Sequence, residues 1–349
     1  MIKDKKLILG ASFFILLGLA ATSTIVNIWP KPVEASIKQV KVMLNGQELK
    51  PSDKAGMYKN GDEYVPMSIL SGKTIYVPIR FAFESTGFGV NWDEKGSVVN
   101  LTSNQPVKPA QSFIVAAHRG YSNAAPENTM ASFKAAVDNK AAILEFDVQI
   151  SQDGVPVIIH DNTVDRTTSG KGEVKKLTLA QLQALDAGSK FNLRFAGEKI
   201  PTLKEVLDFA KTSTVTLYPE IKGYRTKEDI TIMMNELMNA GFEQRSVIQS
   251  FNYADFDTVR SISQKMKIAL LVNNDMAQFM TALDKAVAYK NAALFVHSGL
   301  LTKYPRLIEL AHLSGVEVVA WTVDDKNTAS TLMDKGADGI ITNRLDLFK

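Results

Sequence analysis

The stretch AAILEFDVQISQDGVPVIIHD, residues 141–161, decides which fold the chain can adopt. It begins as an apolar run typical of a buried β-strand, yet the run contains Glu145 and Asp147. After an Asp-Gly pair the chain becomes apolar again and stops at His160 and the Asp that follows it. A parallel crossover needs about a dozen residues or more, and only 151–154 separate the two runs. The runs are therefore predicted to form an antiparallel hairpin that turns at the Asp-Gly pair.

Short apolar runs alternate with amphipathic helical patterns around this hairpin, which is typical of a parallel sheet. The strand candidates lie at 113–117, 142–150, 155–159, 215–221, 247–251, 268–272, 292–296, 316–322 and 339–342. Without the returning arm of the hairpin, eight parallel strands remain, the number that closes a barrel. We therefore predict that 113–349 is an α/β fold, a (β/α)8 TIM barrel with a β-hairpin excursion. The stretch 161–200 is too long for a simple loop and is predicted to be a small insertion with a helix at 179–185.

Glu145 and Asp147 share one face of their strand, because side chains two positions apart point the same way. Both lie toward the C-terminal end of the strand, where barrel enzymes carry the active site. Two parallel carboxylates without a cation repel each other and lose hydration. Glu220, at the end of the next barrel strand, can complete a set of three. The chain has no Cys, and an all-oxygen set favours Ca²⁺ or Mg²⁺ over zinc. The sequence leaves the choice between these two ions open.

Imidazole and cationic side chains are predicted at the same rim of the barrel. The first strand runs into His118 and Arg119, the hairpin returns His160, and Lys222 follows Glu220 on the same face. Arg offers a bidentate fork to a phosphate, and Lys offers a point charge. Imidazoles, carboxylates and cations at one rim predict metal-assisted phosphoryl chemistry.

A set of motifs continues through the whole predicted barrel. In chain order they are AHRGYSNAAPENTMASF, ILEFDVQISQDGVPVIIHDNTVDRTTSGKGEV, LDAGSKF, IPTLKEVL, YPEIK, IQSFN, VAWTVDD and GADGIITN. They resemble the glycerophosphodiester phosphodiesterase family over nearly all of 113–342. The resemblance implies a (β/α)8 barrel that uses a divalent cation to hydrolyse glycerophosphodiesters to glycerol phosphate and an alcohol. One departure is visible, since the last strand usually ends in a Thr-Asp-x-Pro-like sequence and here reads TNRL at 342–345.

The resemblance also implies roles for the rim residues. The acid–base pair would be His118 and His160, the metal ligands Glu145, Asp147 and Glu220, and the phosphate contacts Arg119 and Lys222. One neutral and one protonated His predict a bell-shaped dependence of activity on pH. Whether water or a neighbouring glycerol hydroxyl attacks the phosphorus stays open.

Three further residues have two interpretations each. Trp321 either stacks against substrate or fills the barrel, and the resemblance favours substrate. Glu127 and Asn128 open a helix. Asn128 is either its N-cap or, with Glu127, a contact that supports the rim.

Residues 1–35 are expected to be a signal peptide or a membrane anchor. Lysines precede the uncharged run LILGASFFILLGLAATSTIVNIW at 7–29. A run of this length can span a bilayer, which needs about 20 apolar residues. The positive-inside rule then places the rest of a bacterial chain on the extracellular side of the membrane, or in the medium if the segment is cleaved.

Residues 36–103 are predicted to form a small α+β module. Alternating apolar positions run into Asn45-Gly46, a hairpin signal, and we expect a helix at 79–85 and a last strand at 98–101. The segment YVPIRFAFESTGFGVNWDEKGSVVNL resembles the copper amine oxidase N-terminal-like domain, although the module has no His or Cys to bind copper. It is either a spacer or an attachment to the cell wall or a partner. The polar stretch 104–112 is predicted to be a linker.

The composition limits the partners. A net charge of +3, from 40 basic and 37 acidic side chains, is too balanced to predict binding of nucleic acid. The expected substrate is a small glycerophosphodiester or a teichoic-type polymer. The alternative functions are a phosphoinositide-type phospholipase C and a non-enzymatic wall-binding protein on an inactive barrel. The intact set of rim residues argues against the inactive barrel.

Overall fold

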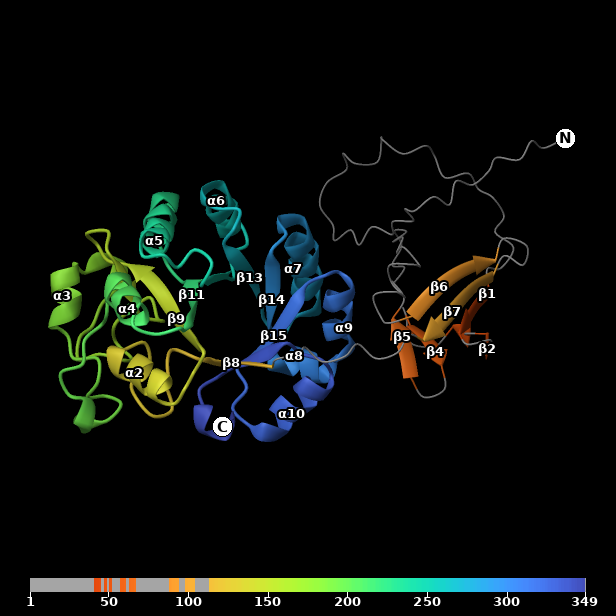
Figure 1. Cartoon of the computed structure of the whole chain (residues 1–349), viewed down its shortest axis with the longest axis horizontal. Coiled ribbons are helices and arrows are strands. Elements are labelled where there is room, and N and C mark those ends of the chain that lie inside the picture. Colours follow the sequence, from red (N-terminus) through yellow and green to blue (C-terminus); the bar gives the residue numbers. More distant parts are fainter. Residues whose placement is uncertain are drawn as a thin grey trace. The chain divides into compact units, whose positions relative to one another are not determined.

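The computed structural model describes residues 113–348 and, between 41 and 103, the residues of seven β-strands. The chain divides into two compact units, Met1–Val107 and Lys108–Lys349, so the division falls within the predicted linker. Figure 1 draws the described helices and strands of both units.

The strands of the N-terminal unit form two small sheets. In the first, the order is β2-β1-β7-β6, from β1 (Lys41–Leu44), β2 (Gln47–Glu48), β6 (Phe88–Asp93) and β7 (Val98–Ser103). The second is antiparallel, from β3 (Lys50–Pro51), β4 (Met57–Asn60) and β5 (Glu63–Pro66). The pairing of β1 with β2 across 45–46 confirms the predicted hairpin, and β7 confirms the predicted last strand.

Two predictions for the N-terminal part concern residues that are not among the described ones. The helix expected at 79–85 and the apolar run at 7–29 both lie outside the described residues. Among the residues that are described, no helix combines the length and the apolar character needed to cross a membrane.

Eight parallel strands close a barrel in the C-terminal unit, as the sequence predicts. Neighbours pair in parallel all the way round, and the last strand pairs with the first. In spatial order they are β8 (Ile114–Ala117), β9 (Ile143–Ile150), β11 (Thr216–Ile221), β12 (Val247–Ser250), β13 (Lys267–Val272), β14 (Ala292–His297), β15 (Glu317–Trp321) and β16 (Gly339–Thr342).

The predicted hairpin is confirmed by β10 (Pro156–Ile158), which pairs antiparallel with β9. The Asp153 carboxylate accepts hydrogen bonds from the Ser151 hydroxyl and from the Leu179 backbone N–H, and so ties the turn to the insertion. At the other end the Ile159 N–H donates to the Asp147 carbonyl over 3.0 Å. The next residue therefore returns to the level of Asp147 at the barrel mouth.

Helices cover the outside of the barrel (Figure 1). The insertion contributes α3 (Leu179–Ala184), where the sequence predicts a helix. The others are α2 (Met130–Asp138), α4 (Leu203–Ala210), α5 (Lys227–Asn239), α6 (Asp255–Ile262), α7 (Met276–Tyr289), α8 (Ser298–Lys303), α9 (Arg306–Leu313) and α10 (Lys326–Asp334).

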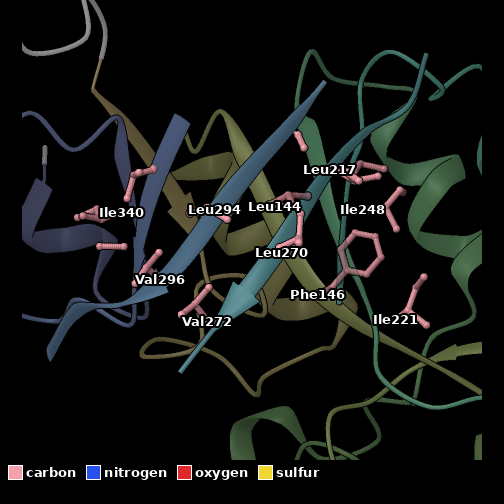
Figure 2. Packing of buried hydrophobic residues seen from close by; sticks show 14 of the residues in the cluster. Leu144, Phe146, Leu217, Ile221, Ile248, Leu270, Val272, Leu294, Val296 and Ile340 are labelled. Atoms are coloured by element: carbon pink, nitrogen blue, oxygen red, sulfur yellow. The ribbon is translucent and has the colours of Figure 1, made fainter. Parts of the chain in front are cut away.

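Alternation along each strand separates an outer core from an inner one. Leu144 and Phe146 of β9 belong to the large cluster that packs the strands against the helices, and Figure 2 shows them beside equivalent side chains of neighbouring strands. Ile143 belongs instead to the cluster inside the barrel. Because side chains alternate, Glu145 and Asp147 lie on the inner face with Ile143. The apolar floor of the barrel thus stands directly below the acidic pair.

The turn after β8 requires glycine at position 120. Gly120 has φ +78°, and its N–H approaches the Glu145 carbonyl at 3.3 Å. A Cβ added there would lie 2.4 Å from Ser132 Oγ and 2.7 Å from the Ser132 carbonyl carbon. Gly120→Ala is expected to lower the free energy of unfolding by about 2–4 kcal/mol, since overpacking and a left-handed backbone both destabilise.

Gly241→Ala is the matched control for this substitution. Gly241 has φ +83°, but nothing lies within 4 Å of an added Cβ, so only the backbone term applies, at about 1 kcal/mol. Urea unfolding of both variants measures the difference. Equal losses would show that the contact with Ser132 is not the reason for glycine at position 120.

Candidate active site

Three buried carboxylates converge at the C-terminal ends of β9 and β11. Asp147 pairs in register with Glu220, and Glu145 lies one inward-facing position lower, beside Tyr218. One oxygen from each of the three carboxylates lies within 4.8 Å of the others. The residues are only 1–7% exposed. The structure therefore brings together the three residues that the sequence predicts as metal ligands.

Burial and mutual repulsion work against ionisation of this set. Burial, followed by the charge of Asp147, raises the pKa of both Glu145 and Glu220. Burial also opposes ionisation of Asp147, but the charges of Arg119 and Lys222 outweigh it and hold the pKa of Asp147 below its usual value. A divalent cation among these oxygens would relieve the repulsion, so the donor set fits such an ion in both chemistry and charge.

Arg119 and Lys222 lie directly against the carboxylates. The Arg119 backbone N–H donates to Glu145 Oε2 over 2.9 Å, and its Nε lies 3.3 Å from Asp147 Oδ2. That buried Nε–H has no hydrogen-bond partner. Lys222 Nζ lies 2.9 Å from Glu220 Oε1 and 3.7 Å from Asp147 Oδ1. The structure thus places a guanidinium and an ammonium beside the acidic set, as predicted.

His118 faces the same carboxylates with its Nε2 nitrogen. Its Nδ1 lies 2.7 Å from Asn343 Oδ1, and its Nε2 lies 3.9 Å from Glu145 Oε2. The Asn343 NH₂ group donates to Asp324, which leaves the amide oxygen to face His118. Because that oxygen only accepts, we infer that Nδ1 carries the hydrogen and Nε2 the lone pair. Burial, followed by the charge of Arg119, lowers the pKa of His118 to about 4.

His160 has a different partner, the carboxylate of Asp161. Its Nδ1 lies 2.6 Å from Asp161 Oδ1. Arg166 donates two further hydrogen bonds to that carboxylate, over 2.7 and 3.1 Å. A carboxylate at Nδ1 orients the ring and stabilises an imidazolium when one forms. The two imidazoles therefore have supports of opposite character, a neutral amide and an anion.

Both imidazoles line one cavity of about 240 Å³ at the barrel mouth. Trp321 lies on its wall, with its ring edge-on to Phe251 at 5.7 Å and its Nε1–H donated to the Phe295 carbonyl over 2.8 Å. The ionisable part of the wall consists of His118, Arg119, Glu145, His160, Glu220 and Lys222, and the remaining lining residues are Gln249, Phe251, Leu271, Trp321, Thr322 and Ile341. A small polar group with an apolar face matches such a cavity.

Glu127 and Asn128 contact residues of the rim, and neither is a helix cap. The N-cap interpretation of Asn128 is wrong, because Thr129 caps α2 and accepts a hydrogen bond from the Ser132 N–H. Asn128 donates from Nδ2 to Asp147 Oδ2 over 2.8 Å. Glu127 accepts from Arg119 Nη1 over 2.8 Å. Each therefore holds a charged rim residue in place.

Sequence reasoning missed three supporting residues. Asp161 and Arg166 lie in the insertion, where no periodic pattern marks their role. The position of Asp161 directly after His160 is the signal that could have identified it. Asn343 stands where the chain departs from the usual family pattern, and the structure shows that this position contacts His118.

Comparisons with known proteins identify the family to which the barrel belongs. The model of the glycerophosphoryl diester phosphodiesterase family matches residues 118–347. The chain is 39% identical over 234 residues to a glycerophosphodiester phosphodiesterase from Caldanaerobacter subterraneus subsp. tengcongensis, a match that covers 66% of this chain and 93% of the relative.

Solved structures give the same result. An Oleispira antarctica phosphodiesterase in complex with the product sn-glycerol-3-phosphate is 28% identical with a TM-score of 0.61, over 67% of this chain and 95% of the other. A glycerophosphodiester phosphodiesterase from Agrobacterium tumefaciens is 26% identical with a TM-score of 0.59, over 68% and 99%. The chain therefore belongs to the glycerophosphoryl diester phosphodiesterase family, and its barrel is that of a phosphoric diester hydrolase.

Proposed function

We propose that this hydrolase cleaves glycerophosphodiesters to glycerol phosphate and an alcohol, with one divalent cation and with His118 and His160 as the acid–base pair. The convergence of three buried carboxylate oxygens within 4.8 Å, in a cavity lined by both imidazoles, carries the proposal. The relative that holds sn-glycerol-3-phosphate supports glycerol phosphate as the product.

Glu145, Asp147 and Glu220 would hold the cation. When bound, it would act as a Lewis acid on a phosphate oxygen. The all-oxygen ligand set supports Ca²⁺ or Mg²⁺. Arg119, whose Nε–H has no hydrogen-bond partner, and Lys222 would offset the remaining charge of the phosphate.

The supports of the two imidazoles favour a division of roles. His118, held by an amide with Nε2 unprotonated, takes the proton from the attacking oxygen as the new P–O bond forms. His160, held by Asp161, gives a proton to the alcohol oxygen as the old P–O bond breaks. The attacking oxygen is that of water or of the neighbouring glycerol hydroxyl. Trp321 and Phe251 would contact the apolar side of the substrate.

The location and the N-terminal module are also part of the proposal. Residues 1–35 would export the chain or anchor it to the membrane, so the barrel would work outside a bacterial cell. Residues 36–103, which resemble the copper amine oxidase N-terminal-like domain, would be a spacer or a wall attachment. In that location both small glycerophosphodiesters and teichoic-type polymers are suitable substrates.

Release of glycerol phosphate from glycerophosphocholine tests the proposal. We expect turnover with Ca²⁺ or Mg²⁺ and a fall of about 10³-fold or more with a chelator, since a Lewis acid contributes several kcal/mol. Cleavage of phosphoinositides in place of glycerophosphocholine would point to the phospholipase C alternative. No turnover of any diester, with binding to cell wall retained, would leave the non-enzymatic alternative.

A further inference from the structure

A single arginine of the insertion connects the two catalytic halves of the site. Arg166 donates from Nε and Nη2 to Asp161 over 2.7 and 3.1 Å, and from Nη1 and Nη2 to Glu127 over 2.8 Å each. Asp161 also pairs with His160, at 2.6 Å, and Glu127 with Arg119, at 2.8 Å. The contacts thus run without a break from the imidazole of His160 to the guanidinium of Arg119.

The geometry of Arg166 is better suited to orienting its neighbours than to stabilising the fold. Its side chain is 48% exposed, so solvent screens its ion pairs and limits their contribution to folding. Its planar fork, however, engages two carboxylates at once, which a Lys ammonium cannot reproduce. Hydrogen bonds from Arg166 lower the pKa of Asp161. Burial opposes ionisation of Glu127, but the hydrogen bonds from Arg166 and the charge of Arg119 outweigh it and lower the pKa of Glu127 as well. Without Arg166, these two anions would lose their shared cation.

We propose that Arg166 is a positioning residue that sets the His160 ring and the Arg119 guanidinium from one support. The inference rests on the proposed function, in which His160 protonates the leaving alcohol and Arg119 binds the phosphate. Arg166 acts on His160 only through Asp161, and on Arg119 only through Glu127. Its loss should therefore resemble a partial loss of both functions at once.

The test compares Arg166→Gln with a matched control, Arg225→Gln. Arg225 also forks a carboxylate, Asp229, at 2.7 and 3.0 Å, and its side chain is 36% exposed, but it lies against the outer turn of the hairpin. The substrates are glycerophosphocholine and the glycerol phosphodiester of p-nitrophenol, whose phenolate leaves without a proton. We expect Arg166→Gln to lower kcat/KM on glycerophosphocholine about 10–100-fold, the usual effect of an orienting partner. The loss should be clearly smaller on the p-nitrophenyl ester, and Arg225→Gln should match the wild type.

Two double variants separate the two arms of the network. Asp161→Asn with Arg166→Gln should lose little more kcat on glycerophosphocholine than Asp161→Asn alone, because both changes act through His160. Glu127→Gln with Arg166→Gln should raise KM no further than Glu127→Gln alone. The melting temperature of Arg166→Gln should stay close to the wild type, since the Arg166 side chain is 48% exposed.

Several outcomes would overturn the inference. Wild-type kcat/KM in Arg166→Gln removes it. A rise in KM alone, equal for both substrates, assigns Arg166 a direct contact with substrate, and a loss that follows a fall in melting temperature assigns it a merely structural role. If the wild-type protein turned over neither substrate, the result would contradict the proposed function and, with it, the positioning role of Arg166.

Discussion

Glu145→Gln is expected to lower kcat/KM about 10³-fold or more, because it removes one of the three oxygen ligands proposed for the cation, and such an ion contributes several kcal/mol to the transition state. The Gln side chain has nearly the same shape and still accepts the hydrogen bond from the Arg119 backbone N–H. The loss would therefore report the missing charge rather than a collapsed site. Turnover of glycerophosphocholine at saturating Ca²⁺ and Mg²⁺ measures it.

The same substitution is expected to raise the stability of the chelated protein. The folded state raises the pKa of Glu145 through burial and the charge of Asp147, so the folded protein holds that proton more tightly than the unfolded chain. A group of this kind favours folding at low pH, and its contribution falls as pH rises above the unfolded value. The stability gained by Glu145→Gln should therefore grow from about pH 4.5 upward.

Thermal unfolding with chelator measures the stability that Glu145→Gln gains, and thermal unfolding with cation measures the stabilisation by the ion that it loses. A bound ion should stabilise the wild type by about 2.7 kcal/mol at 100 times its dissociation constant, and Glu145→Gln by much less. Glu236→Gln is the matched control, since burial also raises the pKa of Glu236, and one of its buried oxygens has no hydrogen-bond partner. It should stabilise the protein without affecting activity. Undiminished activity or undiminished stabilisation by the ion in Glu145→Gln would contradict the assignment.

His118→Ala and His160→Ala are each expected to lower kcat about 10²–10⁴-fold, the usual contribution of a general acid or base. The two variants should differ in their response to the leaving group. The loss in His160→Ala should shrink on the p-nitrophenyl ester, because phenolate needs no proton. The loss in His118→Ala should stay the same, because the attacking oxygen must still be deprotonated.

His312→Gln provides the control for these two variants. His312 pairs with Asp338 at 2.7 Å, just before the N-terminal end of β16, and so on the opposite side of the barrel from the cavity. Its kcat should match the wild type. If both His118→Ala and His160→Ala kept wild-type rates, the acid–base assignment would be wrong. If the p-nitrophenyl ester rescued His118→Ala instead, the two roles would be exchanged.

The fold was predictable because its strands follow simple patterns. The stretch 151–154 is too short for a parallel crossover. The length of this connection therefore predicts both the hairpin and the count of eight parallel strands. Alternation along β9 then fixed Glu145 and Asp147 on the inner face. The register with β11 placed Glu220 beside them.

The residues that support the side chains of the rim could not be predicted in the same way. Glu127 and Arg166 meet across 39 positions, through an insertion without periodicity. Asn343 reaches His118 across 225 positions, because closure of the barrel by β16 and β8 brings them together. The sequence alone does not identify the N-cap of α2, since Asn and Thr both favour that position. The backbone conformation in the structure shows that the cap is Thr129.

A calorimetric titration of the chelated wild-type protein with Ca²⁺ and with Mg²⁺, followed by activity in the same samples, tests most directly whether the acidic set holds the working ion. We predict one ion bound per chain, activity that returns over the same concentration range, and neither effect in Glu145→Gln. Full turnover of glycerophosphocholine in the presence of chelator, or unchanged binding of the ion by Glu145→Gln, would contradict the account.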